Sequence, residues 1–129
     1  MKKTMLLVTA ALLLPLNAAY SQDLQVRRQD GIAYVSGGVG MDERAEMKAQ
    51  SHGYNLFLTF AEKSGAYLAD VQVVVKALKG HKGFDTVAEG PLLYAALPPG
   101  KYRVSAEFDG KKQSRIVNLG RAHEVFYWK

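Results

Sequence analysis

Along the second half of this chain, hydrophobic and polar residues alternate with a period of two, which is typical of β-strands that bury one face. The alternation predicts strands over residues 56–61, 71–77, 92–97, 102–108 and 114–119. It also predicts an aromatic last strand over 124–128 and a weak edge strand within 84–90. Nearer the N-terminus, residues 32–36 predict one further strand.

Residues 42–50 interrupt the alternation and predict one short helix. The segment is rich in good helix formers, and Asp42 and Glu43 lie in its first turn, where they complement the positive end of the helix dipole. We expect Asp42 to be the N-cap and Gly53 to end the helix. A thin apolar face recurs every four residues at Met41, Ala45 and Ala49. We therefore expect this face to cover an open end or an edge of the β-structure.

Two turn signals are specific. Asp109-Gly110 predicts a tight β-hairpin, because both residue types tolerate positive φ. Pro98-Pro99-Gly100 predicts a type II turn, with Pro99 in the second position and Gly100 in the third. Tyr102 begins the next strand, where a buried hydroxyl can form a hydrogen bond backwards along the chain and lock a corner. We assign structural roles to Pro99, Gly100, Tyr102, Asp109 and Gly110.

Turn residues separate the predicted strands at intervals of about 8 to 12 residues, which is typical of sandwiches. A parallel α/β sheet would need a helix between most strands, and the pattern predicts only one helix. The expected fold is mainly β, a Greek-key β-sandwich of about seven strands with one short N-terminal helix between early strands.

Residues 1–21 have the organisation of a secretory signal peptide. Lys2-Lys3 precedes an apolar run from Met5 to Leu16, and the small residues Ala19 and Ser21 predict cleavage after Ser21. The run is too short to span a bilayer, so we expect a periplasmic or secreted protein without stable membrane insertion after cleavage. Residues 22–129 then form a single domain, in which 22–54 is an N-terminal extension containing a strand and the helix.

Charge and composition narrow the class of partner. The chain has no cysteine, which excludes a lipid-anchored lipoprotein and any disulfide. Loss of the two leader lysines lowers the formal charge from +5 to +3, and the remaining cations are scattered along the chain. Such scattering does not produce the dense basic surface that follows a phosphate backbone, so we expect no nucleic-acid partner. We also expect no cofactor.

Three motifs are similar to those of a known family: Leu97-Pro98-Pro99-Gly100-Lys101-Tyr102, Tyr67-Leu68-Ala69-Asp70-Val71 upstream, and Asp109-Gly110 downstream. With them the chain resembles the carboxypeptidase regulatory-like, transthyretin-like (prealbumin-like) β-sandwich domains. The segment from Tyr34 to Arg44 resembles what short secreted bacterial members carry before that core. The resemblance implies a seven-stranded sandwich that commonly serves as a non-catalytic accessory or interaction module.

Three sharper interpretations involve chemistry. One transthyretin-like branch hydrolyses 5-hydroxyisourate with histidine and arginine residues and a Tyr-Arg-Gly-Ser carboxyl terminus, whereas this chain ends Val125-Phe126-Tyr127-Trp128-Lys129. A periplasmic copper-binding protein is a further alternative, because imidazole and thioether suit copper, but the histidines lack ligand spacing. Gly37-Gly38-Val39-Gly40 precedes the helix as an anion cradle would, but the acidic residues that follow it would repel an anion. The residues considered for copper are His52, His81, His123, Met41 and Met47.

Consecutive aromatic residues close the chain at Phe126-Tyr127-Trp128, and a strand would turn at least one of them outward. Tyr127 and Trp128 are therefore the candidate binding residues, for stacking on a sugar ring or anchoring a peptide. We predict a non-catalytic, exported binding or accessory module of the bacterial cell envelope, whose partner is an envelope protein or a carbohydrate. A small transthyretin-like hydrolase and a copper-binding protein are the alternatives.

Overall fold

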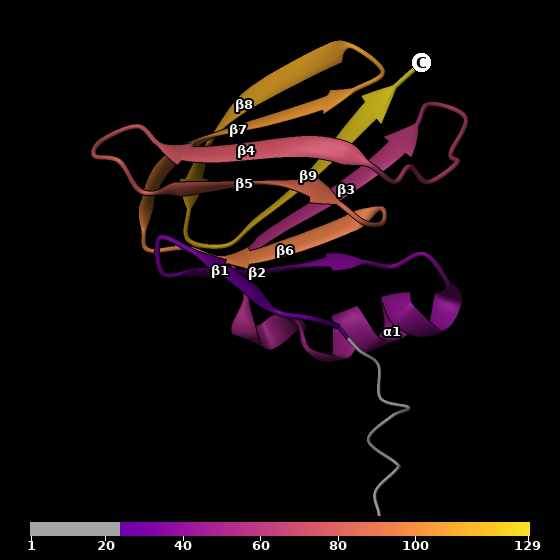
Figure 1. Ribbon diagram of the computed structural model, residues 1–129, viewed down its shortest axis with the longest axis horizontal. Coiled ribbons are helices and arrows are strands. Elements are labelled where there is room, and N and C mark those ends of the chain that lie inside the picture. Colours follow the sequence, from indigo (N-terminus) through magenta and orange to yellow (C-terminus); the bar gives the residue numbers. More distant parts are fainter. Residues whose placement is uncertain (1–23) are drawn as a thin grey trace, which may run out of the picture.

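The computed structural model describes residues 24–129, and the predicted signal peptide lies outside the described residues. Within them, the chain forms a β-sandwich of two sheets with one α-helix (Figure 1). The five-stranded sheet contains, in spatial order, β1 (Arg27–Gln29), β2 (Ile32–Gly37), β6 (Leu92–Ala96), β3 (Leu56–Glu62) and β9 (Ala122–Trp128). The four-stranded sheet contains β5 (Gly83–Ala88), β4 (Val71–Ala77), β7 (Gly100–Phe108) and β8 (Lys111–Leu119). The predicted mainly β sandwich is confirmed.

The described residues contain nine strands, where about seven were expected and eight segments were predicted as strands. The strand without a predicted segment is β1, a polar segment without alternation, which pairs with β2 through a two-residue turn at Asp30-Gly31. Both turn residues have positive φ, 50° and 76°, as this type of hairpin requires. The Asp30-Gly31 turn therefore forms a hairpin, whose first strand hydrophobic alternation does not predict.

The N-terminal strand is an integral part of the sandwich. β2 pairs with β6 inside the five-stranded sheet, and it contributes Ile32 and Tyr34 to the buried core. The Tyr34 ring stacks on Phe84 of the opposite sheet, with 4.6 Å between ring centroids. Residues 22–54, expected as an extension, thus include a strand that helps to hold the two sheets together.

The helix α1 (Met41–Ala49) lies on the outer face of the five-stranded sheet, not at an end or an edge as expected (Figure 1). Its one buried residue is Met47, which packs with Val35, Phe57 and Tyr94 of the sheet in a second, smaller hydrophobic cluster. The predicted contact face is wrong, since Met41 is exposed. A helix that buries a single side chain has no apolar periodicity from which its orientation can be predicted.

The start of α1 also differs from the prediction. Gly40 is the N-cap, without a side-chain hydrogen bond, so the assignment of Asp42 is wrong. Glu43 instead reaches back, and its Oε1 accepts hydrogen bonds from the backbone N–H groups of Gly38 at 2.7 Å and Val39 at 3.1 Å. The helix ends at Ala49, and the 3₁₀ turn η2 (Ser51–Gly53) follows it. Two amides that an anion cradle would need are therefore occupied by the protein's own carboxylate.

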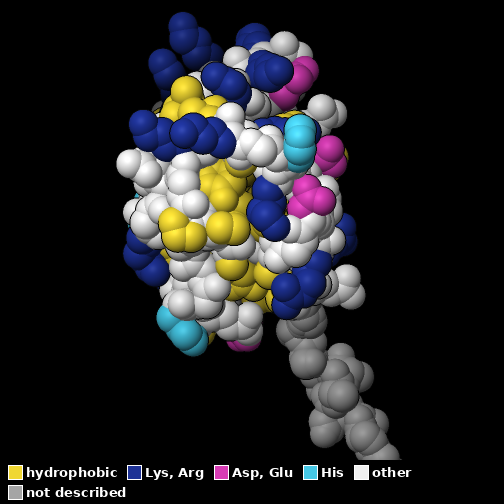
Figure 2. Space-filling model, turned by 90° about the vertical axis from the view of Figure 1, so that its left-hand side faces the viewer, with side chains coloured by type: hydrophobic (Ala, Val, Ile, Leu, Met, Phe, Trp, Pro, Cys, Tyr) yellow, Lys and Arg dark blue, Asp and Glu magenta, His cyan; other side chains and the backbone are white. Residues whose placement is uncertain are grey.

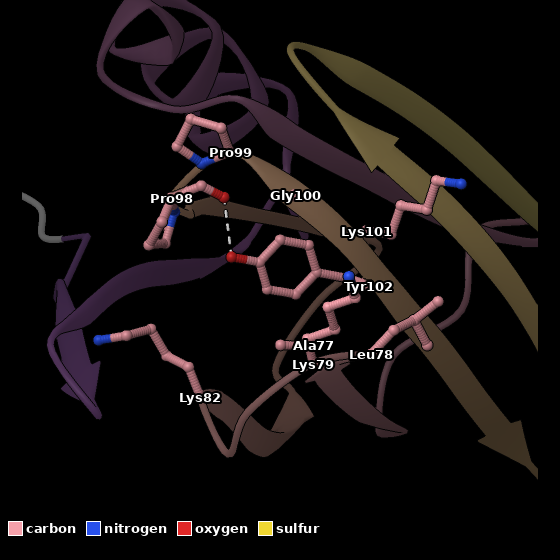
Figure 3. A pocket seen from close by; sticks show the side chains of 9 residues that line it. All are labelled: Ala77, Leu78, Lys79, Lys82, Pro98, Pro99, Gly100, Lys101 and Tyr102. Atoms are coloured by element: carbon pink, nitrogen blue, oxygen red, sulfur yellow. Dashed lines mark hydrogen bonds between the residues drawn. The ribbon is translucent and has the colours of Figure 1, made fainter.

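The Pro98-Pro99-Gly100 segment is a crossing between sheets, because β6 and β7 belong to different sheets. Gly100 has a positive φ of 146°, and it is already the first residue of β7, where it pairs with Leu119 of β8. The type II turn is therefore wrong, since its third residue would have φ of about +80°. The backward hydrogen bond is confirmed: Tyr102 is 3% exposed and its hydroxyl donates to the Pro98 carbonyl at 2.8 Å (Figure 3).

The hairpin predicted at Asp109-Gly110 is confirmed. The two residues have φ of 53° and 75°, and they connect Phe108 of β7 directly to its partner Lys111 of β8. No helix among the described residues is long and apolar enough to cross a membrane.

Candidate binding groove beside the helix

A groove of about 640 Å³ runs between α1 and the part of the five-stranded sheet that the helix leaves uncovered. We call it the helix groove. Its floor consists of side chains from β3, β6 and β9, and its wall consists of side chains from α1. The residues that define it are Met41, Arg44, Ala45, Lys48, Ser51, Phe57, Thr59, Tyr67, Leu92, Tyr94, Arg121 and His123.

Strand register explains the shape of the floor. Paired residues on neighbouring strands point to the same face of a sheet, so the outer face carries three rows centred on β3. The rows are Tyr94-Phe57-His123, Leu92-Thr59-Val125 and Tyr67-Ala61-Tyr127. Along the central column, the side chains shrink from phenylalanine to threonine to alanine. The floor is hollowed over Phe57 and Thr59, which line the groove, whereas Ala61 is 4% exposed and does not line it.

One end of the floor is a packed aromatic cluster around Phe57. The Phe57 ring stacks on the His123 imidazole, with 4.5 Å between centroids, and meets the Tyr94 ring edge-on at 4.8 Å. The guanidinium carbon of Arg121 lies 4.5 Å from the Phe57 centroid. Burial raises the pKa of the Tyr94 hydroxyl, so this phenol is neutral near pH 7. The cluster gives this end a rigid base with its polar groups at the rim.

Two aromatic rings are exposed to solvent at the other end of this sheet face, one lining the groove and one beside it. Tyr67 is 54% exposed and Tyr127 is 50% exposed, and the two residues flank the small Ala61 in one row. Tyr127, a candidate from the sequence, thus lies on the open sheet face beside the groove.

The second aromatic candidate occupies a different environment. Trp128 points inward, is 4% exposed, and packs near Phe60, Phe108 and Phe126. Its Nε1 donates a hydrogen bond to the Lys111 carbonyl at 3.0 Å. The strand alternation that exposes Tyr127 buries its neighbour, so Trp128 has a core position and its ring is not available for stacking on a ligand.

The wall and rim of the groove are basic. Arg44 and Lys48 project from α1, and Arg121 lies between β8 and β9. The Arg44 Nη1 donates to the Gly38 carbonyl at 2.9 Å, and its guanidinium carbon lies 5.0 Å from the Tyr67 centroid. No Asp or Glu is among the described residues that line the groove. The arrangement offers the half-exposed Tyr67 ring and positive charge to the same ligand.

A second cavity, of about 610 Å³, lies beside the Pro98–Tyr102 corner (Figure 3). Figure 2 shows this end of the molecule, where hydrophobic side chains form a band flanked by Lys and Arg side chains. The ammonium groups of Lys82 and Lys101 point to opposite sides in Figure 3, and Lys82 Nζ donates to the Asp30 carbonyl at 3.1 Å. Lys82 and Lys101 therefore do not converge on one ligand atom, and the helix groove is the better organised site.

The structure does not bring the three histidines together. His123 lines the helix groove, His52 lines a separate shallow hollow beside Tyr54, and His81 lies in the β4–β5 loop. Among residues 24–129, no group of three or more His, Cys, Asp or Glu side chains is placed to hold a metal ion.

Sequence reasoning identified Tyr127 but missed Arg44, Phe57, Tyr67 and Arg121 as site residues. The only available signal was the alternation of 56–61, which places Phe57 on the face opposite the core. Which part of that face the helix would leave open depends on packing between distant segments. No protein-family model and no curated protein matches this chain.

Proposed function

We propose that this protein is an exported, non-catalytic carbohydrate-binding module of the cell envelope, and that it binds sugar rings in the helix groove and over Tyr127. The observation that carries the proposal is the row Tyr67-Ala61-Tyr127, in which two half-exposed rings flank a small residue on a sheet face. Aromatic rings offer a large, rigid apolar face at low cost in conformational entropy, which suits the apolar faces of sugars.

The spacing of this row suits a flat ligand. Tyr67 and Tyr127 lie on either side of β3, so their backbones are about 10 Å apart, twice the distance between neighbouring strands. Ala61 between them is 4% exposed, so we expect a sugar ring to lie across the two tyrosine rings above it. Tyr67 also lines the helix groove together with Thr59 and Phe57, so a chain of several sugars that contacts Tyr67 continues into the groove along β3.

Binding on the face is favoured over pairing with the β5 or β9 edge. The Gln29 side chain hydrogen-bonds both the N–H and the carbonyl of Asp85 in β5, at 3.2 and 2.6 Å. Gln113 and Arg115 donate to the β9 carbonyls of Tyr127 and Val125, at 2.7 and 2.8 Å. These side chains occupy backbone groups that an added strand would need.

Two features of the sequence support the same proposal. The predicted signal peptide supports export to the envelope. The resemblance to carboxypeptidase regulatory-like domains supports an accessory module without catalysis of its own.

A glycan array probed with the purified protein tests the proposal, followed by calorimetric titration of the best ligand. Tyr127→Ala and Tyr67→Ala should each weaken binding about tenfold, the equivalent of about 1.4 kcal/mol. Ile116→Ala is the matched control, because Ile116 is an exposed hydrophobic residue on the other sheet. Circular dichroism establishes that each variant is folded.

Three results would count against this function. A blank array with folded protein would exclude carbohydrate binding by this domain. Equal affinities for the tyrosine variants and the parent would move the site elsewhere. Cleavage of a bound glycan by the purified protein would replace the module with the hydrolase alternative.

A further inference from the structure

We infer that the sugar bound in the helix groove is acidic, a chain of uronic acid residues whose carboxylates contact Arg44, Lys48 and Arg121. This inference rests on the proposed function and names the ligand class of the same site. It follows from the positions of the three cations, from the contacts that hold the two arginines, and from the absence of an acidic partner for these arginines in the described residues.

The three cations extend along the whole groove. Arg44 lies over Tyr67 at the end near Ala61, and Arg121 lies over Phe57 at the opposite end. Phe57 and Ala61 are four residues apart on β3, a separation of about 13 Å along the strand. Lys48 follows Arg44 by four residues, which places it on the same side of α1 about 6 Å further along. Such a row matches repeated charges along an extended ligand better than a single anion.

The two arginines are held in place by aromatic rings and backbone carbonyls. The Nη1 atom of Arg44 donates to Gly38, and that of Arg121 donates to the Tyr54 carbonyl at 3.4 Å. A guanidinium carries five N–H donors, so each arginine retains donors for a ligand. A fork that is already positioned loses little conformational freedom when it binds a carboxylate.

Both arginines lack an acidic partner within the described part of the chain. The two ion pairs found there are Arg27–Glu89 and Arg115–Glu124, and neither belongs to the groove. The groove therefore carries positive charge that a ligand of opposite charge complements.

The short distance between each guanidinium group and an aromatic ring indicates which kind of anion the groove binds. Each guanidinium lies over an aromatic ring, within 5.0 Å of its centroid, and Phe57 beneath Arg121 is only 5% exposed. A ligand in the groove therefore meets the guanidinium groups at the floor, and an anion carried directly on a sugar ring reaches them without a spacer. A uronic acid carries its anion in this way, because its carboxylate is a substituent of the sugar ring itself. Arginine also matches a carboxylate in geometry, with two parallel N–H···O bonds.

The test compares two forms of one polymer. Oligogalacturonate should bind the purified protein at least about tenfold more tightly than the same oligosaccharide with its carboxyl groups methyl-esterified, because charge-assisted hydrogen bonds are lost on esterification. Affinity for the acidic form should fall as salt rises from about 0.05 to 0.5 M, and affinity for the ester should not.

Substitutions of the two groove arginines test whether these residues cause the preference for the acidic form. Arg121→Gln and Arg44→Gln should weaken binding of the acidic form about tenfold and leave binding of the ester within about twofold. Arg103→Gln is the matched control, since it removes the same charge from an exposed position on β7, in the other sheet. Arg44 also contacts the loop before α1, so Arg121, in an exposed turn, provides the independent test.

The outcomes separate this inference from the proposed function. Equal affinity for acid and ester overturns the inference and leaves a carbohydrate-binding module intact. Absence of binding to every glycan, acidic or neutral, overturns both. Equal affinity for polyacrylate or dextran sulfate also overturns the inference, because charge without a uronic acid would then suffice.

Discussion

Removal of a single oxygen atom tests how the corner between the sheets is held. In Tyr102→Phe the buried ring remains, and only the hydroxyl that donates to the Pro98 carbonyl at 2.8 Å is lost. Pro98 is exposed, so water can satisfy its carbonyl in the variant. The expected loss is therefore the net value of one hydrogen bond, about 0.5 to 1.5 kcal/mol, without the penalty of an unsatisfied buried group. In a domain of this size, each kcal/mol corresponds to about 4 to 8 °C in Tm.

Urea unfolding followed by tryptophan fluorescence measures this loss, because Trp128 is the single tryptophan and is buried in the core. Tyr127→Phe is the matched control: it removes the same atom from an exposed side chain, and its free energy of unfolding should stay within about 0.5 kcal/mol of the parent. Equal urea midpoints for Tyr102→Phe and the parent would refute a stabilising corner bond.

The difference in stability between the parent and Tyr102→Phe is predicted to depend on pH. Burial raises the pKa of Tyr102 above its usual value of 10.0, so the folded state holds this proton more tightly than the unfolded state. The resulting stabilisation is complete below pH 10 and is lost as the pH rises through the pKa of the folded state. The stability difference between parent and Tyr102→Phe should therefore shrink above pH 10. A difference that stays constant from neutral to alkaline pH would contradict this assignment.

Three further substitutions test the packing that forms the groove and the corner. Met47→Ala should lower the free energy of unfolding by about 2 to 5 kcal/mol in urea titrations, because it removes the one buried side chain of α1, and an unchanged midpoint would mean that the helix does not pack as described. Gly90→Ala should cost about 1 to 3 kcal/mol, because the added Cβ would overlap the backbone carbonyl of Gly37, whereas Gly53→Ala, which meets nothing within 4 Å, should be neutral in the same assay. Gly100→Val should cost about 1 to 3 kcal/mol through strain at its positive φ, and a thermal midpoint equal to that of the parent would refute that conformation.

The sequence predicts the parts of this fold that local rules determine. Alternation locates the β4 and β7 strands, and turn chemistry locates the hairpin at Asp109-Gly110, because both depend on neighbouring residues. The parallel pairing of β3 with β9 brings together residues more than sixty positions apart, such as Phe57 and His123, and no local rule specifies it. The helix groove depends on this pairing and on the placement of α1, so its floor and wall could not be predicted together.

The glycine pair before the helix connects a sequence motif to the proposed site. Gly38 has a φ of 92°, and a Cβ there would lie 3.0 Å from the Leu92 side chain and 3.2 Å from Cγ of Arg44. Only a residue without a side chain lets the chain turn this sharply while Leu92 and Arg44 approach it from both sides. Glu43 then ties the turn to the first turn of α1 through the Gly38 and Val39 amides. The glycine motif therefore does not contact the ligand itself. It positions α1, whose basic side chains we propose bind the acidic sugar.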